Sequence, residues 1–327
     1  MNDPIPPPFS LPLFPFPLTI AILGAGAWGT TLATLASQQG HTVQMWSRQG
    51  SQSLQSVMDG AGVVFSAVSM KGVRQVAEQV RSLKIAPNTI FVSATKGLDP
   101  DSGSETELPN LPSQIWQAAL PDHPVVVLSG PNLSAEIQKG LPAATVVASA
   151  NETAAEQVQQ ALSSTSFRVY TNADILGVEL GGILKNVIAI AVGACDGLQL
   201  GTNAKAALVT RGLAEIIRIG INWGAKPETF YGLSGLGDLL ATCNSALSRN
   251  YQVGYGLAQG KSLSDVLESL QGTAEGINTT QVLVRLASQQ RIALPISHQV
   301  DQLLQGKITP QAALEALMLR DRKPENR

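Results

Sequence analysis

The stretch LTIAILGAGAWG, residues 18–29, sets the architecture of the first half of the chain. Its first six residues are apolar and partly β-branched, which is typical of a buried parallel strand. The glycine turn that follows opens a helix at Thr30–Gln39. In this context Gly24 permits a tight turn, Gly26 lets the backbone approach a pyrophosphate, and Gly29 lets the helix pack on the strand. The helix N-terminus adds unpaired N–H groups, so the turn predicts a bound dinucleotide.

Strands and helices alternate beyond the turn, with a helical pattern at Val73–Leu83. Apolar, β-branched runs predict further strands at Thr42–Trp46, Gly62–Val68, Thr89–Ser93, Val125–Leu128 and Ala144–Ala148. This alternation predicts an α/β fold, a Rossmann-like doubly wound and mostly parallel sheet with helices on both faces.

The rhythm changes after Tyr170, where only helical patterns remain. They lie at Asp174–Val192, Ala204–Asn222, Val253–Ala258, Leu263–Leu270, Thr279–Ser288 and Gln311–Leu319. We therefore predict a dinucleotide-binding domain over residues 18–170 and an all-α C-terminal domain over residues 171–327.

Residues 1–17 are rich in proline and contain no basic residue, which excludes a secretory signal and forbids a helix. We predict an extended or disordered tail. No later stretch approaches twenty apolar residues without a charge or a polar break, so we expect no membrane-spanning helix and a cytoplasmic protein.

The composition excludes several classes of function. A net charge of -2 gives no electrostatic footprint for nucleic acid or for an anionic membrane, so an anionic ligand must be held by a few placed basic groups. Cys195 and Cys243 are the only cysteines, and we expect two reduced thiols in helices. His41, His123 and His298 show no metal-ligand spacing, so no metal site is expected.

The second strand bears on the choice of cofactor. An acidic residue at its end would hydrogen-bond the ribose hydroxyls of NAD, but the strand here ends Met45-Trp46-Ser47-Arg48. Arg48 could instead pair with a 2′-phosphate, so NADPH is favoured over NADH. A solvated surface arginine is the alternative.

Four clusters combine small residues with charge or polar groups, and two of them follow apolar strands, where open α/β sheets bind ligands. They are residues 93–98, 129–132, 181–186 and 235–238, the last with Ser248-Arg249-Asn250 beyond it. Lys185 lies within an apolar helical run, so it either reaches outward at an amphipathic edge or is functionally buried. Burial would lower its pKa and suit proton transfer.

Two more residues of these clusters have open interpretations. Asp238 lies in a glycine-flanked turn, where it orients Lys185 or caps a helix. Arg249 offers a planar set of donors for a phosphate, although a surface arginine is the simpler reading.

An ordered series of segments resembles the bacterial-type NAD(P)-dependent glycerol-3-phosphate dehydrogenases, from about Leu18 to the end of the chain. The segments read GAGAWGTTLA, SATKGL, LSGPN, GVELGGILKNVIAIAVGACDGL, NAKAALVTRGLAEI, GLSGLGDLLATC, SRN and GTAEG. The resemblance implies a 6-phosphogluconate-dehydrogenase-like fold and reversible reduction of dihydroxyacetone phosphate to sn-glycerol 3-phosphate for phospholipid synthesis. It also implies a homodimer.

The resemblance assigns roles by position. It makes Lys185 the catalytic general acid toward the carbonyl oxygen, and the base in reverse. The positions that match substrate contacts are Lys96, Gly130, Asn132, Lys185, Asp238, Ser248, Arg249 and Asn250. Those that match cofactor contacts, beyond Gly24, Gly26, Ala27 and Gly29 of the turn, are Trp28, Arg48, Lys96, Ser134, Arg249, Thr273 and Glu275.

The chain departs from the family pattern in several places. Asn132 stands where Ser or Thr is usual, Leu133-Ser134 replaces Phe-Ala, and Ala67-Val68-Ser69 lacks the usual proline. The connection between residues 48 and 62 is much shorter than usual, and the proline-rich head lies outside the pattern.

Two alternatives remain. A β-hydroxyacid or 6-phosphogluconate-type dehydrogenase shares the two-domain plan and a lysine on a helix, but the segments SRN and GLGDL favour the triose-phosphate enzyme. A non-catalytic dinucleotide sensor would bind the cofactor without turnover.

Overall fold

The apolar run of residues 18–23 forms strand β1 (Thr19–Leu23), the second strand of a seven-stranded sheet in the computed structural model. The structure describes residues 15–101, 108–270, 272–321 and 324. The sheet order is β2-β1-β3-β4-β5-β6-β7. The other strands are β2 (Thr42–Trp46), β3 (Val63–Ser66), β4 (Ile90–Ser93), β5 (Val125–Ser129), β6 (Ala143–Ala148) and β7 (Phe167–Asn172).

The first five strands are parallel to one another, as predicted, but β6 runs antiparallel to β5, and β7 runs parallel to β6. This reversal places the start of β6 beside the carboxyl end of β5, where Ser129 lies opposite Val146. Ligands of open α/β sheets bind at the carboxyl ends of parallel strands. Residues of β6 therefore reach that edge.

Helices cover both faces of the sheet because alternate residues of each strand point to opposite faces. Ile20 and Ile22 face the core beneath α1 (Ala27–Gln38), α5 (Ser134–Ile137) and α6 (Glu152–Leu162). Ala21 and Leu23 face the core beneath α2 (Leu54–Met58), α3 (Met70–Arg81) and α4 (Pro112–Ala119).

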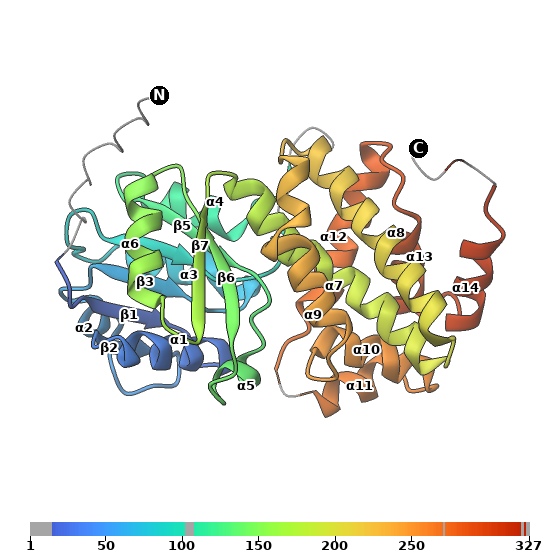
Figure 1. The fold of residues 1–327 in the computed structure, drawn as a ribbon, viewed down its shortest axis with the longest axis horizontal. Helices are drawn as coiled ribbons and strands as arrows, with labels where there is room; N and C mark the ends of the chain where they lie inside the picture. The colour runs from blue at the N-terminus through green and yellow to red at the C-terminus, as the bar shows by residue number, and fades with distance from the viewer. Residues whose placement is uncertain (1–14, 102–107, 271, 322–323, 325–327) are drawn as a thin grey trace, which may run out of the picture.

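The second half of the chain is helical and is built around α7 (Ile175–Gly197), which is buried along nearly its whole length (Figure 1). Around it lie α8 (Gly201–Asn222), η1 (Pro227–Tyr231), η2 (Leu233–Gly237), α9 (Asp238–Cys243), α10 (Arg249–Ala258), α11 (Leu263–Ser269), α12 (Glu275–Gln289), α13 (Pro295–Leu304) and α14 (Pro310–Met318). Helix α7 is long and apolar enough to cross a membrane, but 83% of its most apolar window is buried inside the structure, as in the core helix of a soluble protein.

The fold agrees with the sequence predictions, while several single helices and strands differ from them. The fold class is confirmed, and Cys195 and Cys243 are free, buried and helical, as expected. No predicted range covers helices α2, α4, α5, α6, α9 and α13, the short helices η1 and η2, or strand β7. Helix α10 begins at Arg249, four residues before the predicted start, because Ser248 caps it. The predicted tail falls largely outside the described residues.

The domain boundary stays a prediction. Strand β7 ends at Asn172, two residues beyond the predicted end of the dinucleotide-binding domain, and α7 begins at Ile175.

Helices α7 and α10 touch backbone to backbone at Gly254, where a Cβ atom would lie 1.8 Å from the carbonyl oxygen of Ile190. We expect Gly254→Ala to lower the free energy of unfolding by about 1–3 kcal/mol, because the helices must separate. Gly72→Ala in α3 is the matched control, since the nearest atom to its added Cβ is 3.9 Å away. Denaturant unfolding of both variants measures the difference, and equal stabilities would contradict this packing.

Candidate active site

The glycine turn has the geometry that its motif requires. Gly24 has a φ of +113°, and a Cβ there would lie 2.7 Å from the carbonyl oxygen of Ala67. A Cβ on Gly29 would lie 1.8 Å from the carbonyl oxygen of Gly24, so helix α1 can approach β1 only without a side chain at that position. A larger residue at position 29 would move α1 away from the sheet, and one at position 24 would clash with the backbone that follows β3.

The space above the turn fits the phosphates of a dinucleotide. Gly26 is exposed, and no atom lies within 4 Å of where its Cβ would be. Gly26 is also the N-cap of α1, which has no side-chain cap and no acidic residue in its first turn, beginning at Ala27. Unpaired N–H groups at a helix N-terminus bind anions. The turn therefore fits the pyrophosphate that the motif predicts.

The short connection after β2 is closed by α2. Its Val57 and Met58 are buried in the core beneath β1 and β3, and Ser53 caps the helix through the N–H of Ser56. Arg48 is exposed just beyond the end of β2. The connection thus leaves the sheet covered and Arg48 open to solvent.

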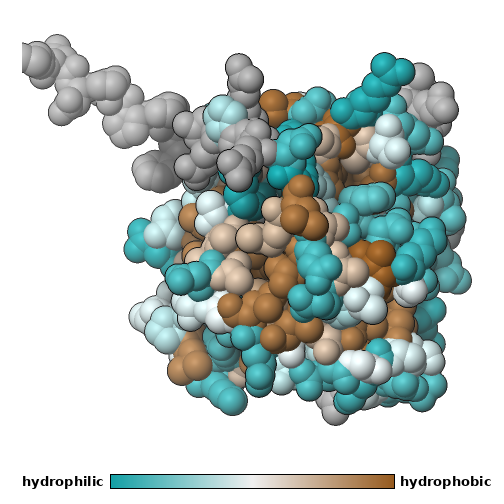
Figure 2. All heavy atoms as spheres, turned by 90° about the vertical axis from the view of Figure 1, so that its right-hand side faces the viewer, coloured by the Kyte–Doolittle hydropathy of each residue, from teal (hydrophilic) through white to brown (hydrophobic). Residues whose placement is uncertain are grey.

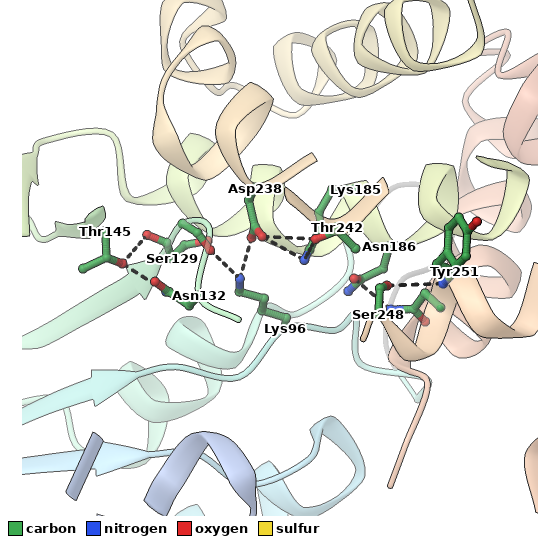
Figure 3. Close-up of polar contacts among 12 residues, drawn as sticks. Lys96, Ser129, Asn132, Thr145, Lys185, Asn186, Asp238, Thr242, Ser248 and Tyr251 are labelled. Carbon is green, nitrogen blue, oxygen red and sulfur yellow. Dashed lines mark hydrogen bonds and ion pairs between the residues drawn. The ribbon is translucent and has the colours of Figure 1, made fainter. Parts of the chain in front are cut away.

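Lys185 is buried on α7, which excludes the outward-reaching alternative. Its Nζ donates to Oδ1 of Asp238 at 2.9 Å and to Oγ1 of Thr242 (Figure 3). Asp238 is the first residue of α9 and is 2% exposed, and Thr242 lies one helical turn later on the same face. Asp238 therefore holds the lysine, and Gly237, not Asp238, is the N-cap of α9.

A second lysine reaches the same carboxylate. Lys96, three residues after β4, donates from Nζ to Oδ2 of Asp238 and to the carbonyl oxygen of Gly130, the latter at 3.1 Å. Burial lowers the pKa of Lys96 to about 8, with Asp238 raising it and the nearby charge of Lys185 lowering it. We call Lys96, Asp238 and Lys185 the lysine–aspartate cluster.

Two glycines of α7 let the parts of the cluster meet. A Cβ on Gly181 would lie 2.7 Å from the carbonyl oxygen of Ser234 in η2, the turn that precedes Asp238. A Cβ on Gly182 would lie 2.1 Å from Oγ of Ser129. The close approach of α7 to both segments depends on the absence of these side chains.

Asn132 lies beside the cluster with one unsatisfied acceptor. Its Nδ2 donates to Oγ1 of Thr145 at 3.0 Å, and Thr145 donates to the carbonyl oxygen of Ser129 at 2.8 Å. Oδ1 of Asn132 is buried and finds no hydrogen-bond partner among the described residues. A buried orphan acceptor is costly, so this atom is suited to accept a hydrogen bond from a ligand hydroxyl.

The residue after Lys185 anchors the predicted phosphate site. Asn186 accepts from Nδ2 of Asn250 at 2.9 Å, and Oδ1 of Asn250 accepts from the N–H of Gly276 at 2.9 Å. Ser248 is the N-cap of α10, and Arg249 is exposed at the start of that helix. Asn250 therefore fixes the start of α10 against α7 and α12.

The side chain of Glu275, the first residue of α12, contacts the sheet-containing half. It accepts a hydrogen bond from the N–H of Met70 at 3.1 Å. Burial raises the pKa of Glu275, and the hydrogen bond from Met70 together with the charges of Arg249 and Lys71 lowers it. This contact brings the predicted cofactor position of α12 to the N-terminus of α3.

The structure thus brings Lys96, Gly130, Asp238 and Lys185 into one hydrogen-bonded group. Trp28 is half-buried on α1, Ser134 begins α5, and Thr273 is exposed just before α12. Sequence reasoning assigned no role to Thr242, Asn186 or Thr145, although Asn186 lies in the cluster of residues 181–186. For Thr242 a signal was present, since a hydroxyl four residues after Asp238 lies on the same helical face.

Two family models match the chain. The model of the NAD-dependent glycerol-3-phosphate dehydrogenase C-terminus matches residues 174–315. The model of the N-terminus of the same family matches as two segments, 19–53 and 49–155, and the break falls in the short connection after β2.

Individual proteins match along nearly the whole chain. A glycerol-3-phosphate dehydrogenase [NAD(P)+] of Nostoc sp. is 67% identical over 307 residues, 94% of this chain and 98% of that protein. One of Synechocystis sp. is 58% identical over 94% of this chain and 96% of that protein. The crystal structure of glycerol-3-phosphate dehydrogenase from Coxiella burnetii has a TM-score of 0.87 at 34% identity, covering 94% of this chain and all of that chain. The chain therefore belongs to the NAD-dependent glycerol-3-phosphate dehydrogenase family.

Proposed function

We propose that the chain catalyses the reversible reduction of dihydroxyacetone phosphate to sn-glycerol 3-phosphate with NADPH or NADH. The family and the names of its relatives support this activity. The observation that carries the proposal is the buried lysine–aspartate cluster at the carboxyl edge of the sheet. The product would feed phospholipid synthesis in the cytoplasm.

Lys185 is the proposed general acid. An ammonium group has three N–H donors, of which Asp238 and Thr242 take two, so one remains for the substrate carbonyl oxygen. When bound, a nicotinamide would supply the hydride, and negative charge would develop on the carbonyl oxygen as the hydride is transferred. Lys185 stabilises this charge and transfers its proton to the oxygen. In the reverse direction neutral Lys185 removes the proton from the hydroxyl.

Lys96 supports the same reaction from the other side of Asp238. Its Nζ also has one donor left after the contacts with Asp238 and Gly130, and it carries charge below pH about 8. We propose that this donor contacts the substrate, with Asn132 Oδ1 accepting from a substrate hydroxyl. The two lysines and Asn132 would fix the reacting carbon relative to the cofactor.

The substrate phosphate is proposed to bind at the start of α10. Arg249 offers exposed guanidinium donors, and Ser248 and Asn250 flank it. Asn250 uses the oxygen and one N–H of its amide to contact Gly276 and Asn186, so its main role there is to hold the helix start in place. Binding energy from the remote phosphate can then serve to orient the carbonyl.

The cofactor is proposed to lie along the glycine turn, with Trp28, Ser134, Thr273 and Glu275 as further contacts and Lys96 and Arg249 shared with the substrate. Arg48 is exposed where the adenosine ribose of such a cofactor binds, which favours NADPH.

The outer face of the helical half supports the proposed homodimer. Helix α14 has no buried residue, and its Met318 is 76% exposed. Figure 2 shows a broad apolar area on this side of the molecule, and a cavity of about 510 Å³ with mostly apolar walls lies between α7, α8, α13 and α14. Exposed apolar patches of this kind mark protein interfaces.

The activity is tested by following NADPH absorbance with dihydroxyacetone phosphate. We expect turnover from the wild-type chain, and a fall in kcat of about 10²- to 10⁴-fold in Lys185→Ala, since general-acid catalysis is lost. NADPH affinity should be nearly unchanged. The control is Lys261→Ala, because Lys261 is exposed and lies two residues before α11. NADPH binding without turnover in the wild type would instead support a dinucleotide sensor.

The role of Arg48 is tested by Arg48→Asp. We expect the ratio of kcat/KM for NADPH to that for NADH to fall about 10- to 100-fold, because a charge-assisted hydrogen bond to the 2′-phosphate is lost. Arg81→Asp makes the same charge change at an exposed position of α3 and should leave the ratio unchanged. An unchanged ratio in Arg48→Asp removes the structural argument for NADPH.

The dimer is tested by sedimentation velocity. We expect wild-type chains to sediment as dimers and Met318→Glu to shift them to monomers, because a charge would be buried in the interface. Leu267→Glu, at a position of α11 that is 41% exposed, should remain dimeric. A monomeric wild type, or a dimeric Met318→Glu variant, contradicts an interface on this face.

A further inference from the structure

We propose that Glu179 is a positioning residue that holds the loop carrying Lys96 and the helix carrying Lys185 at the spacing that the reaction needs. The inference rests on the proposed function for its kinetic part only. Glu179 lies on α7, six residues before Lys185. Like Lys185, it is a charged residue within an apolar helical run, flanked by Val178 and Leu180.

Three donors surround the carboxylate. Oε1 accepts from the backbone N–H of Ser113 at 2.9 Å and from Oγ of Ser93 at 3.4 Å, and Oε2 accepts from Oγ of Ser113. Glu179 is 2% exposed, and it takes part in no ion pair among the residues that the structure describes. All its polar contacts therefore run from α7 to the sheet-containing half.

One of these donors lies on the strand that leads into the cluster, and the other two lie on α4. Ser93 ends β4, and Lys96 follows three residues later. Ser113 lies in the first turn of α4, so the carboxylate also sits at a helix N-terminus, where negative charge is favoured. Glu179 thus ties α7 to the base of the Lys96 loop, while Asp238 ties Lys96 to Lys185 at its tip. The loop is therefore linked to α7 directly at Ser93 and through Asp238 at Lys96.

The energetics argue for a positional role. A buried carboxylate costs free energy even when it is hydrogen-bonded, and an apolar side chain of similar size would pack there at lower cost. Burial raises the pKa of Glu179 to about 7, against the lowering by the hydrogen bonds from Ser113 and Ser93. What an apolar replacement could not provide is a directional contact to two separate segments.

A second buried carboxylate offers a matched control. Glu215 on α8 accepts from the N–H groups of Ile296 and Ser297 and from Oγ of Ser297, at the start of α13. Burial raises its pKa as well. Glu215 therefore makes the same kind of contact as Glu179, between two helices of the helical half and without contact to the cluster.

The kinetic test compares Glu179→Ala, Glu179→Gln and Glu215→Ala. We expect Glu179→Ala to lower kcat about 10- to 100-fold through misplacement of the two lysines, with the KM for NADPH little changed. Glu179→Gln can accept from Ser113 N–H and donate to the serine hydroxyls, so it should keep most of the activity. Glu215→Ala should lower the unfolding midpoint yet keep kcat. Wild-type kcat in Glu179→Ala, or an equal loss in Glu215→Ala, overturns the proposal.

A second variant and a measurement that needs no turnover also test the role of Glu179. If Glu179→Ala does not fold, Glu179→Asp retains the charge but shortens the reach by one methylene, and a wild-type kcat in that variant overturns the proposal. Hydrogen exchange of residues 94–98 needs no turnover, so it separates this proposal from the proposed function. These amides should exchange faster in Glu179→Ala than in Glu215→Ala, and equal exchange overturns the proposal even if the wild type proves inactive.

Discussion

One carboxylate, that of Asp238, lies between two lysine ammonium groups that come from opposite halves of the chain. Two positive charges on one negative charge leave an excess positive charge in a buried site, where electrostatic interactions are stronger than in water. Such a site favours a substrate that develops negative charge on an oxygen. The lowered pKa of Lys96 follows from the same arrangement, since burial and the neighbouring Lys185 oppose its protonation. The cluster thus joins the sheet-containing half to the helical half, and in the proposed reaction it is the source of the proton.

The rest of the fold can be understood as support for this cluster. Helix α7 is apolar and buried, and its two charged residues near the sheet, Glu179 and Lys185, are each satisfied by partners outside the helix. Glycines at 181 and 182 let α7 approach the segments that carry Asp238 and Gly130. The reversed direction of β6 brings Thr145 to the same edge, where it orients Asn132.

Local patterns allowed the glycine turn, the sheet-containing half and the helical half to be predicted. The apolar neighbours of Lys185 indicated two alternatives, burial or an outward reach, and only the partner Asp238 decides between them. That partner lies 53 residues away in sequence, and periodicity carries no information about such contacts. The direction of β6 could not be predicted either, because an apolar run has the same pattern in a parallel and an antiparallel strand. The roles of Asn186 and Glu179 were missed because they depend on segments brought close by the fold.

The claim that Asp238 is shared by Lys185 and Lys96 is tested most directly by an NMR titration of lysine side chains in the free protein. The signal of Lys96 is identified by its loss in Lys96→Arg. We expect it to titrate near pH 8 in the wild type and at lower pH in Asp238→Asn, because the carboxylate that favours its protonated form is gone. A midpoint unmoved in Asp238→Asn would contradict the shared carboxylate, and a wild-type midpoint of about 10.4, the value of an exposed lysine, would contradict the desolvation of Lys96 in the cluster.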